Sequence, residues 1–223
     1  MLKPALAIMS RVPSKDGKSR LGTLLSPAQR EALQWAFLED TLDKVRRLTE
    51  FESYLALTPA GDIKRLAKRL GAGGRVMAQS GGNLGQRMHD IAEKLFLVGH
   101  APVILIGTDV PSLPPSYLQE ALNLLEQSDL VFGPAVDGGY YLIGMRNFEG
   151  RVFEGISWGS ERVLEQTLNI CEVHNLSYRL LKYLMDIDRP GDLQALMSQY
   201  ENNNIDDELI PARTIRLLKS IKI

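Results

Sequence analysis

The chain has 223 residues, of which 44% are hydrophobic and 24% charged, and this composition excludes a disordered, collagen-like or coiled-coil protein. Its 26 basic and 27 acidic residues leave a net charge of −1, so no overall field favours nucleic acid or an anionic membrane as a partner. One cysteine excludes an internal disulfide framework and a cysteine-rich zinc site. Without a secretion signal or a stretch that could span a bilayer, we expect a cytoplasmic protein with no stable membrane insertion.

Short apolar runs alternate with amphipathic helical patterns along the chain, which predicts βα units and a mostly parallel sheet. The expected strands are residues 5–9, 54–58, 75–78, 102–106, 130–134, 140–144 and 178–181. The expected helices are residues 27–48, 62–70, 84–98, 115–126, 160–175, 190–199 and 211–221. We therefore expect a three-layer α/β/α domain at 1–200, with about seven strands in its central sheet. A polar linker and a last helix at 201–223 are expected to pack on the same domain.

The loop after the first expected strand is rich in cations. Arg11, Lys18 and Arg20 lie within ten residues of one another, and such side chains bind phosphate groups well. Because open α/β sheets bind ligands beyond the carboxyl ends of their strands, this loop is a candidate polyphosphate site. A solvated charged loop explains the same residues equally well.

Glycines follow the third expected strand. Gln79, Gly81 and Gly82 precede the start of a helix, where glycine permits close approach of a ligand and the helix terminus favours an anion. An ordinary β–α turn with Asn83 as the helix cap is the alternative interpretation.

Aspartates follow two further strands. Thr108 and Asp109 come directly after the fourth strand, and a carboxylate at this edge is well placed to hold a cation against phosphates. An Asx-turn explains Asp109 as well. Late in the chain, Asp186 and Asp188 would project to the same side of an extended segment and could share one cation. Asp188 could instead cap the helix that begins at Pro190.

Asp137-Gly138 lies between two apolar runs, which predicts a β-hairpin. Gly139 directly follows this pair. A hairpin alone does not require a second glycine, so a ligand packed close to the backbone is the competing interpretation.

The segments at 107–113, 133–144, 156–158 and 186–193 together resemble a bacterial family of glycosyltransferase-like proteins with the GT-A fold. The segments at 37–42 and 84–88 resemble the same family, and residues 18–21 are similar to the N-terminal loop of phospho-lactate guanylyltransferases. The resemblance covers most of the chain. It implies a nucleotide-diphospho-sugar transferase fold with one antiparallel strand near 140–144.

The resemblance also implies a nucleotide bound across the first strands and a cation, Mg²⁺ or Mn²⁺, held by Asp109 and Asp188. Asp109, Asp137 and Lys18 are then the candidate catalytic residues. The candidate nucleotide-binding residues are Arg11, Lys18, Arg20, Gln79, Gly81, Gly82, Thr108, Gly138 and Gly139.

Taken together, the sequence predicts a metal-dependent transferase that acts on a nucleotide. Nucleotidyl transfer from a nucleoside triphosphate to a small phosphorylated or carboxylated acceptor is favoured, because the basic first loop suits a triphosphate and its pyrophosphate leaving group. Glycosyl transfer from a nucleotide-sugar, with Asp137 or another acid as the base, is the first alternative. A non-catalytic nucleotide-binding module is the second.

Overall fold

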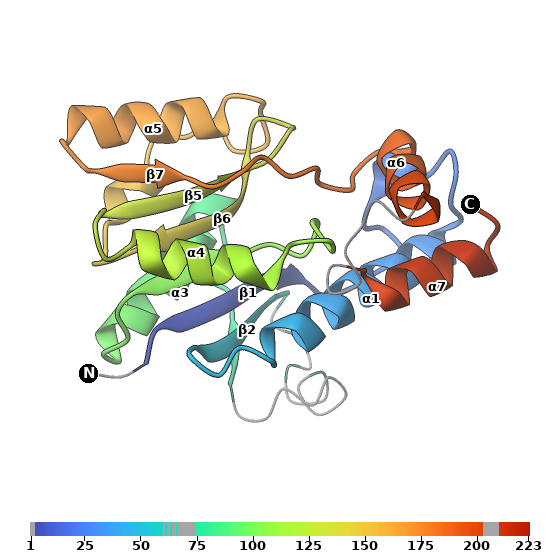
Figure 1. Cartoon of the computed structure of the whole chain (residues 1–223), viewed down its shortest axis with the longest axis horizontal. Coiled ribbons are helices and arrows are strands. Elements are labelled where there is room, and N and C mark those ends of the chain that lie inside the picture. Colours follow the sequence, from blue (N-terminus) through green and yellow to red (C-terminus); the bar gives the residue numbers. More distant parts are fainter. Residues whose placement is uncertain (1–2, 60, 62, 64–65, 67–74, 203–209) are drawn as a thin grey trace.

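A computed structural model describes the chain except residues 1–2, 60, 62, 64–65, 67–74 and 203–209. The described residues form a seven-stranded sheet in the order β3-β2-β1-β4-β6-β5-β7 (Figure 1). The strands are β1 (Ala5–Arg11), β2 (Glu52–Thr58), β3 (Val76–Ala78), β4 (Val103–Ile106), β5 (Leu130–Pro134), β6 (Tyr140–Met145) and β7 (Tyr178–Leu180). β6 runs antiparallel to β4 and β5, and the other neighbouring strands are parallel. The predicted mostly parallel sheet and its one antiparallel strand are confirmed.

Helices cover both faces of this sheet. The elements α1 (Pro27–Val45) and α4 (Pro115–Leu124) bury apolar side chains on one face, and α3 (Leu84–Leu97) and α5 (Val163–Val173) do so on the other. Two short 3-10 helices, η1 (Ser19–Leu21) and η2 (Gly150–Phe153), lie in the connections. The predicted three-layer architecture is therefore confirmed.

Two further helices, α6 (Pro190–Glu201) and α7 (Ala212–Ser220), lie together at one end of the molecule beside α1 (Figure 1). Their apolar side chains form a separate cluster with residues of α1 and of the first loop, including Phe37, Leu193 and Leu218. This cluster joins the last two helices to α1 and to the first loop. The expected helix at 62–70 lies largely outside the described residues.

A buried carboxylate joins α7 to α1. Asp40 is 4% exposed, and its oxygens accept hydrogen bonds from the backbone N–H groups of Arg213 and Thr214, both at 2.9 Å. The Thr214 hydroxyl donates to the same carboxylate at 2.8 Å. These groups belong to the first turn of α7, where backbone N–H groups have no partner within the helix. Asp40 thus caps the N-terminus of α7. This structural role accounts for an aspartate in the 37–42 segment.

We expect Asp40→Ala to lower the free energy of unfolding by roughly 3 kcal/mol, because it leaves two buried donors of Thr214 and one partly buried donor of Arg213 without an acceptor. Urea unfolding followed by circular dichroism measures this difference. The matched control is Asp43→Ala, which removes partly exposed ion pairs to Arg46 and Arg213 and should cost less than about 1 kcal/mol. Equal losses in the two variants would contradict the capping role.

Candidate active site

The carboxyl ends of the parallel strands open onto one cavity of about 1500 Å³. The loops that follow β1, β3 and β4 line it, together with the β5–β6 turn and the segment that follows β7. The predicted site residues among its lining are Arg11, Lys18, Arg20, Gln79, Thr108, Asp109, Asp137, Gly138, Gly139 and Asp188. Residues that are separated by up to 177 positions in the sequence therefore share one cavity.

Gly81 and Gly82 are not among the residues that line this cavity. Gly82 has a φ of +95°, and a Cβ there would lie 2.0 Å from the side-chain oxygen of Gln86. Gln86 and Asn83 in turn form a reciprocal capping box at the start of α3. The capping interpretation of this loop is thus confirmed, and it accounts for Gly82 without a ligand.

Lys18 lies between the two aspartates that were predicted to hold a cation. Its ammonium nitrogen is 2.9 Å from Asp109 Oδ1 and 3.7 Å from Asp188 Oδ1, and it donates to the Ile187 carbonyl at 2.6 Å. The side chain is only 9% exposed. Lys18 therefore neutralises this pair of carboxylates and does not extend freely into solvent.

The segment after β7 is fixed in place by backbone hydrogen bonds. The Leu184 N–H donates to the backbone carbonyl of Pro134 at 3.1 Å, and the Ile187 N–H donates to the backbone carbonyl of Asp109 at 2.8 Å. The buried Tyr141 adds a hydroxyl hydrogen bond to the Lys182 carbonyl at 3.0 Å. These contacts bring residues 186–188 beside the loop that follows β4.

Asp188 does not cap α6, contrary to one interpretation of the sequence. Arg189 is the cap residue, and the carboxylate of Asp192 accepts the N–H groups of Asp188 and Arg189 at 2.9 and 2.6 Å. Asp192 can reach back in this way because it lies in the first turn of α6. The Asp188 side chain is left free for Lys18 and for an ion pair with Arg20, and this pairing raises the pKa of the Arg20 guanidinium.

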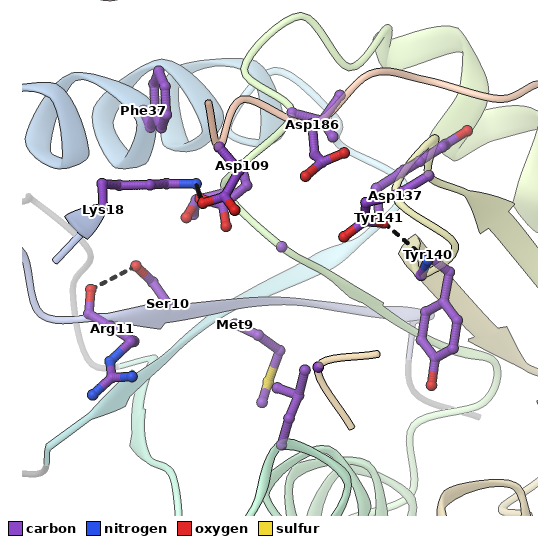
Figure 2. A pocket seen from close by; sticks show the side chains of 18 of the residues that line it. Met9, Ser10, Arg11, Lys18, Phe37, Asp109, Asp137, Tyr140, Tyr141 and Asp186 are labelled. Carbon is purple, nitrogen blue, oxygen red and sulfur yellow. Dashed lines mark hydrogen bonds and ion pairs between the residues drawn. The ribbon is translucent and has the colours of Figure 1, made fainter. Parts of the chain in front are cut away.

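Two further carboxylates, Asp137 and Asp186, complete this group. The side chains of Asp109, Asp137 and Asp186 point into the same space in Figure 2. Burial and, next, the negative charge of Asp137 raise the pKa of Asp186 to about 6. The sequence left open whether Asp186 or Asp188 faces the site, and in the structure both line the cavity. We call Asp109, Asp137, Asp186 and Asp188 the carboxylate cluster.

Within the described part of the chain, no three acidic, histidine or cysteine side chains are close enough to form a ready-made metal site. The carboxylate cluster offers only oxygen atoms as metal ligands, and such ligands suit Mg²⁺ and Mn²⁺. A cation held here would therefore need further oxygens from water or from a ligand.

The β5–β6 connection is the predicted hairpin, and both of its glycines lie at the cavity. Asp137 Oδ1 accepts the N–H of Gly139 at 2.9 Å, which closes the turn. Gly138 has a φ of +88°, and a Cβ there would lie 2.0 Å from the Glu161 carbonyl oxygen. The Gly138 carbonyl also accepts the N–H of Leu164 at 2.9 Å, so close packing against the start of α5 requires this glycine.

Arg11 lies apart from the other cations of the first loop. In Figure 2, Arg11 and Met9 point to the opposite side of β1 from Lys18 and Asp109. The two-residue period of a strand places Met9 and Arg11 on one face, and Met9 packs in the same cluster as Met88 of α3. Arg11 and Lys18 therefore line the same cavity from opposite sides of β1.

Arg87 is a cavity residue that the sequence interpretation did not select. It lies in the first turn of α3, where the helix dipole disfavours a cation. Burial and the neighbouring Arg11 lower the pKa of Arg87. The signal in the sequence was an arginine at the unfavourable end of a helix with no acidic residue in that first turn.

The family model described as "Uncharacterized protein conserved in bacteria (DUF2064)" matches residues 41–160. The chain is also similar to the crystal structure of a candidate nucleotide-diphospho-sugar transferase from Desulfovibrio desulfuricans G20. The two are 30% identical with a TM-score of 0.90, and the match covers 99% of this chain and 97% of that chain. The nucleotide-diphospho-sugar transferase-like fold and the resemblance found in the sequence are confirmed.

Two named relatives are guanylyltransferases. The 3-phospho-D-glycerate guanylyltransferase of Phenylobacterium zucineum (strain HLK1) is 33% identical over 154 residues, which are 64% of this chain and 66% of the relative. The chain therefore spans slightly less than two thirds of that protein. The 2-phospho-L-lactate guanylyltransferase of Methanobrevibacter smithii is 25% identical over 213 residues, which are 94% of this chain and 87% of the relative.

A structure of CMP:2-keto-3-deoxy-manno-octonic acid synthetase complexed with CTP has a TM-score of 0.58 at 11% identity. The match covers 91% of this chain and all of that one, and it shows a shared fold alone. None of the helices in the described residues is long and apolar enough to cross a membrane.

Proposed function

The chain belongs to the bacterial family DUF2064, and on that premise we propose that it transfers a nucleotidyl group from a nucleoside triphosphate to a small phosphorylated or carboxylated acceptor. The observation that carries this proposal is the charge arrangement of the cavity, in which Lys18 and Arg20 are paired with acids of the carboxylate cluster. The names of the two guanylyltransferase relatives support the same reaction class, since both describe nucleotidyl transfer to a phosphorylated acid.

A divalent cation, Mg²⁺ or Mn²⁺, is part of the proposal. Asp109 and Asp188 would hold it, with Asp186 beside them, because these side chains offer the oxygen donors that such ions prefer. The four carboxylates of the cluster outnumber the two cations paired with them, Lys18 and Arg20, which leaves negative charge for a bound cation to balance. Bound there together with the nucleotide, the ion would draw charge from the phosphoryl oxygens.

The chain's own residues would bind and orient the reactants. An oxygen of the acceptor attacks the α-phosphorus, the bond from the α-phosphorus to the bridging oxygen breaks, and pyrophosphate leaves with the electron pair of that bond. Lys18 and Arg20 would stabilise the charge of the leaving pyrophosphate. Asp137 would orient the acceptor, since its Oδ1 is held by Gly139 while its Oδ2 has no hydrogen bond within the described residues.

The identity of the released product tests this proposal. We expect pyrophosphate when the protein is incubated with Mg²⁺, the four nucleoside triphosphates and a panel of small phosphorylated or carboxylated acids. Coupled detection of pyrophosphate, with mass spectrometry of the nucleotidylated acceptor, measures the reaction. No pyrophosphate above the level of an Asp109→Asn control, with any triphosphate or acceptor, would contradict the proposal.

The same assay separates the two other functions that the sequence left open. A glycosyltransferase would break the sugar–phosphate bond of a nucleotide-sugar and release a nucleoside diphosphate. A binding module would bind nucleotide and release neither product. The name of the Desulfovibrio desulfuricans structure makes nucleotide-sugars the appropriate comparison substrates.

A further inference from the structure

One wall of the cavity lies away from the carboxylate cluster, between β1, the end of β3 and the start of α3. We call this wall the α3 slot and define it by six cavity-lining residues: Met9, Arg11, Gln79, Leu84, Arg87 and Met88. Figure 2 shows that Met9 and Arg11 point to this side of β1. The carboxylate cluster would hold phosphates through a cation, so the α3 slot is left for another part of the nucleotide.

Gln79 presents one fixed hydrogen-bond acceptor to the slot. Gln79 is only 7% exposed. Its amide nitrogen donates to the Ser10 carbonyl at 3.0 Å and to the Ala56 carbonyl at 2.7 Å. Two carbonyl partners fix which end of the amide is nitrogen, since an oxygen there would face two other oxygens. The remaining atom, Oε1, has no partner within the described residues, so it is available to an N–H group of a ligand.

Arg87 and Arg11 present unpaired donors to the same slot. The described residues supply neither side chain with a carboxylate partner, and Arg87 makes one hydrogen bond, to the Asn83 carbonyl at 3.2 Å. Burial first, and then the positive charge of Arg11, lowers the pKa of Arg87. Arg87 is the half-buried member of the pair and Arg11 the exposed one. The two terminal nitrogens of the Arg87 guanidinium make no hydrogen bond within the described residues, so they are available to a ligand with adjacent acceptors.

The rest of the slot is apolar. Met9 and Met88 are 9% and 5% exposed, and Leu84 is an exposed large hydrophobic residue at the cavity. Thioether and aliphatic side chains suit the flat face of an aromatic ring better than a hydrated phosphate. A ligand with apolar faces and a polar edge therefore fits this wall.

We propose that the α3 slot binds the base of the nucleotide and selects guanine. This inference rests on the proposed function. Guanine carries two acceptors side by side, O6 and N7, which match an arginine bidentately, and it carries N–H donors on the neighbouring edge for an acceptor such as Gln79 Oε1. Adenine and cytosine present an amine where guanine presents O6, and that amine would face a guanidinium. Uracil offers a single oxygen on its corresponding edge and no N7.

Titration calorimetry with modified nucleotides tests the proposal on the wild-type protein, with Mg²⁺ present. GTP is expected to bind more tightly than ATP, CTP and UTP. We expect 7-deaza-GTP, which lacks the N7 acceptor, to bind about tenfold more weakly than GTP. ITP, which lacks the 2-amino group, or N1-methyl-GTP, which lacks the N1 donor, should bind at least about fivefold more weakly. Changing the ligand in this way leaves the Gln79 hydrogen bonds between β1 and β2 intact.

The variant Arg87→Met tests whether Arg87 makes the contact to N7 of guanine. The difference between GTP and 7-deaza-GTP should disappear in Arg87→Met and remain tenfold in Arg179→Met, a matched control on β7 outside the cavity. If Arg87→Met weakens GTP and 7-deaza-GTP by the same factor, Arg87 holds a phosphate and the proposal is wrong. It is also wrong if GTP has no advantage over the other triphosphates, or if both ITP and N1-methyl-GTP bind as well as GTP.

The outcomes separate this inference from the reaction on which it rests. Selective GTP binding without pyrophosphate release would retain the α3 slot as a guanine site and remove the nucleotidyl-transfer proposal. Pyrophosphate release with a preference for another base would do the reverse.

Discussion

Asp109→Asn is expected to reduce pyrophosphate release by about 10²–10³-fold at saturating nucleotide and Mg²⁺, because removing one preorganised electrostatic contact has effects of this size. The amide keeps the shape of the side chain but cannot balance a divalent cation or the Lys18 ammonium 2.9 Å away. Steady-state kinetics with the pyrophosphate assay measure the loss.

The fold should tolerate this substitution, since the Asp109 side chain is 56% exposed and a pair of this kind contributes less than about 1 kcal/mol to stability. Asp129→Asn is the matched control, because it breaks the ion pair to Arg146 away from the cavity. The control should retain the wild-type rate. An Asp109→Asn rate above a tenth of wild type would remove Asp109 from the reaction.

The strands of the sheet were accessible from the sequence because buried strands leave continuous apolar runs. The run at 130–134 coincides with β5, and the run at 140–144 differs from β6 by one residue. Helix ends were less accurate. The expected helix at 160–175 begins at Val163 instead of residue 160, and the backbone of Glu161, just before it, packs closely against Gly138.

The cavity could be predicted as a set of loops but not as a set of contacts. Strand order and the carboxyl edge brought Lys18, Asp109 and Asp137 together as expected. Two outcomes depended on local patterns that the sequence interpretation did not use. Asp192 took over the cap of α6 from Asp188, and the alternation of β1 directed Arg11 away from Lys18.

The sequence interpretation did not select Arg87 or Asp40, because an ordinary structural role accounted for each of them. Arg87 lay inside a segment that an ordinary helix start explained, so its unfavourable position in the first turn went unused. Asp40 lay in an amphipathic helix, and the partner that makes it a cap is 173 residues further along the chain. Long-range partners of this kind are set by tertiary packing, which no local period records.

Lys18→Ala is expected to cause the second large effect, a loss of about 100-fold or more in pyrophosphate release, because it removes a charge-assisted contact to the leaving group. Without ligand, the Lys18 ammonium is held by Asp109, Asp188 and the Ile187 carbonyl. A cation bound by the same two aspartates would take over the neutralising role of Lys18. The ammonium would then be released toward the phosphates of the nucleotide.

This exchange predicts two further results for Lys18→Ala. Its aspartates lose their own counter-ion, so Mg²⁺ without nucleotide should raise its melting temperature more than that of the wild type. The affinity for a nucleoside triphosphate should fall more than the affinity for the monophosphate, since only the triphosphate extends to the outer phosphate positions. Lys15→Ala is the matched control, because Lys15 lies on the same loop and is exposed, and it should leave both affinities unchanged.

The product distribution of Lys18→Ala decides which bond the protein breaks. A nucleotidyltransferase depends on a charge that stabilises departing pyrophosphate, and a glycosyltransferase releases a nucleoside diphosphate that never carries a third phosphate. Lys18 therefore matters strongly for the first reaction and little for the second. If a nucleoside diphosphate is the sole product and Lys18→Ala turns over at nearly the wild-type rate, the bond broken is the sugar–phosphate bond. The ion pair of Lys18 with Asp109 then stabilises the loop and has no part in phosphate transfer.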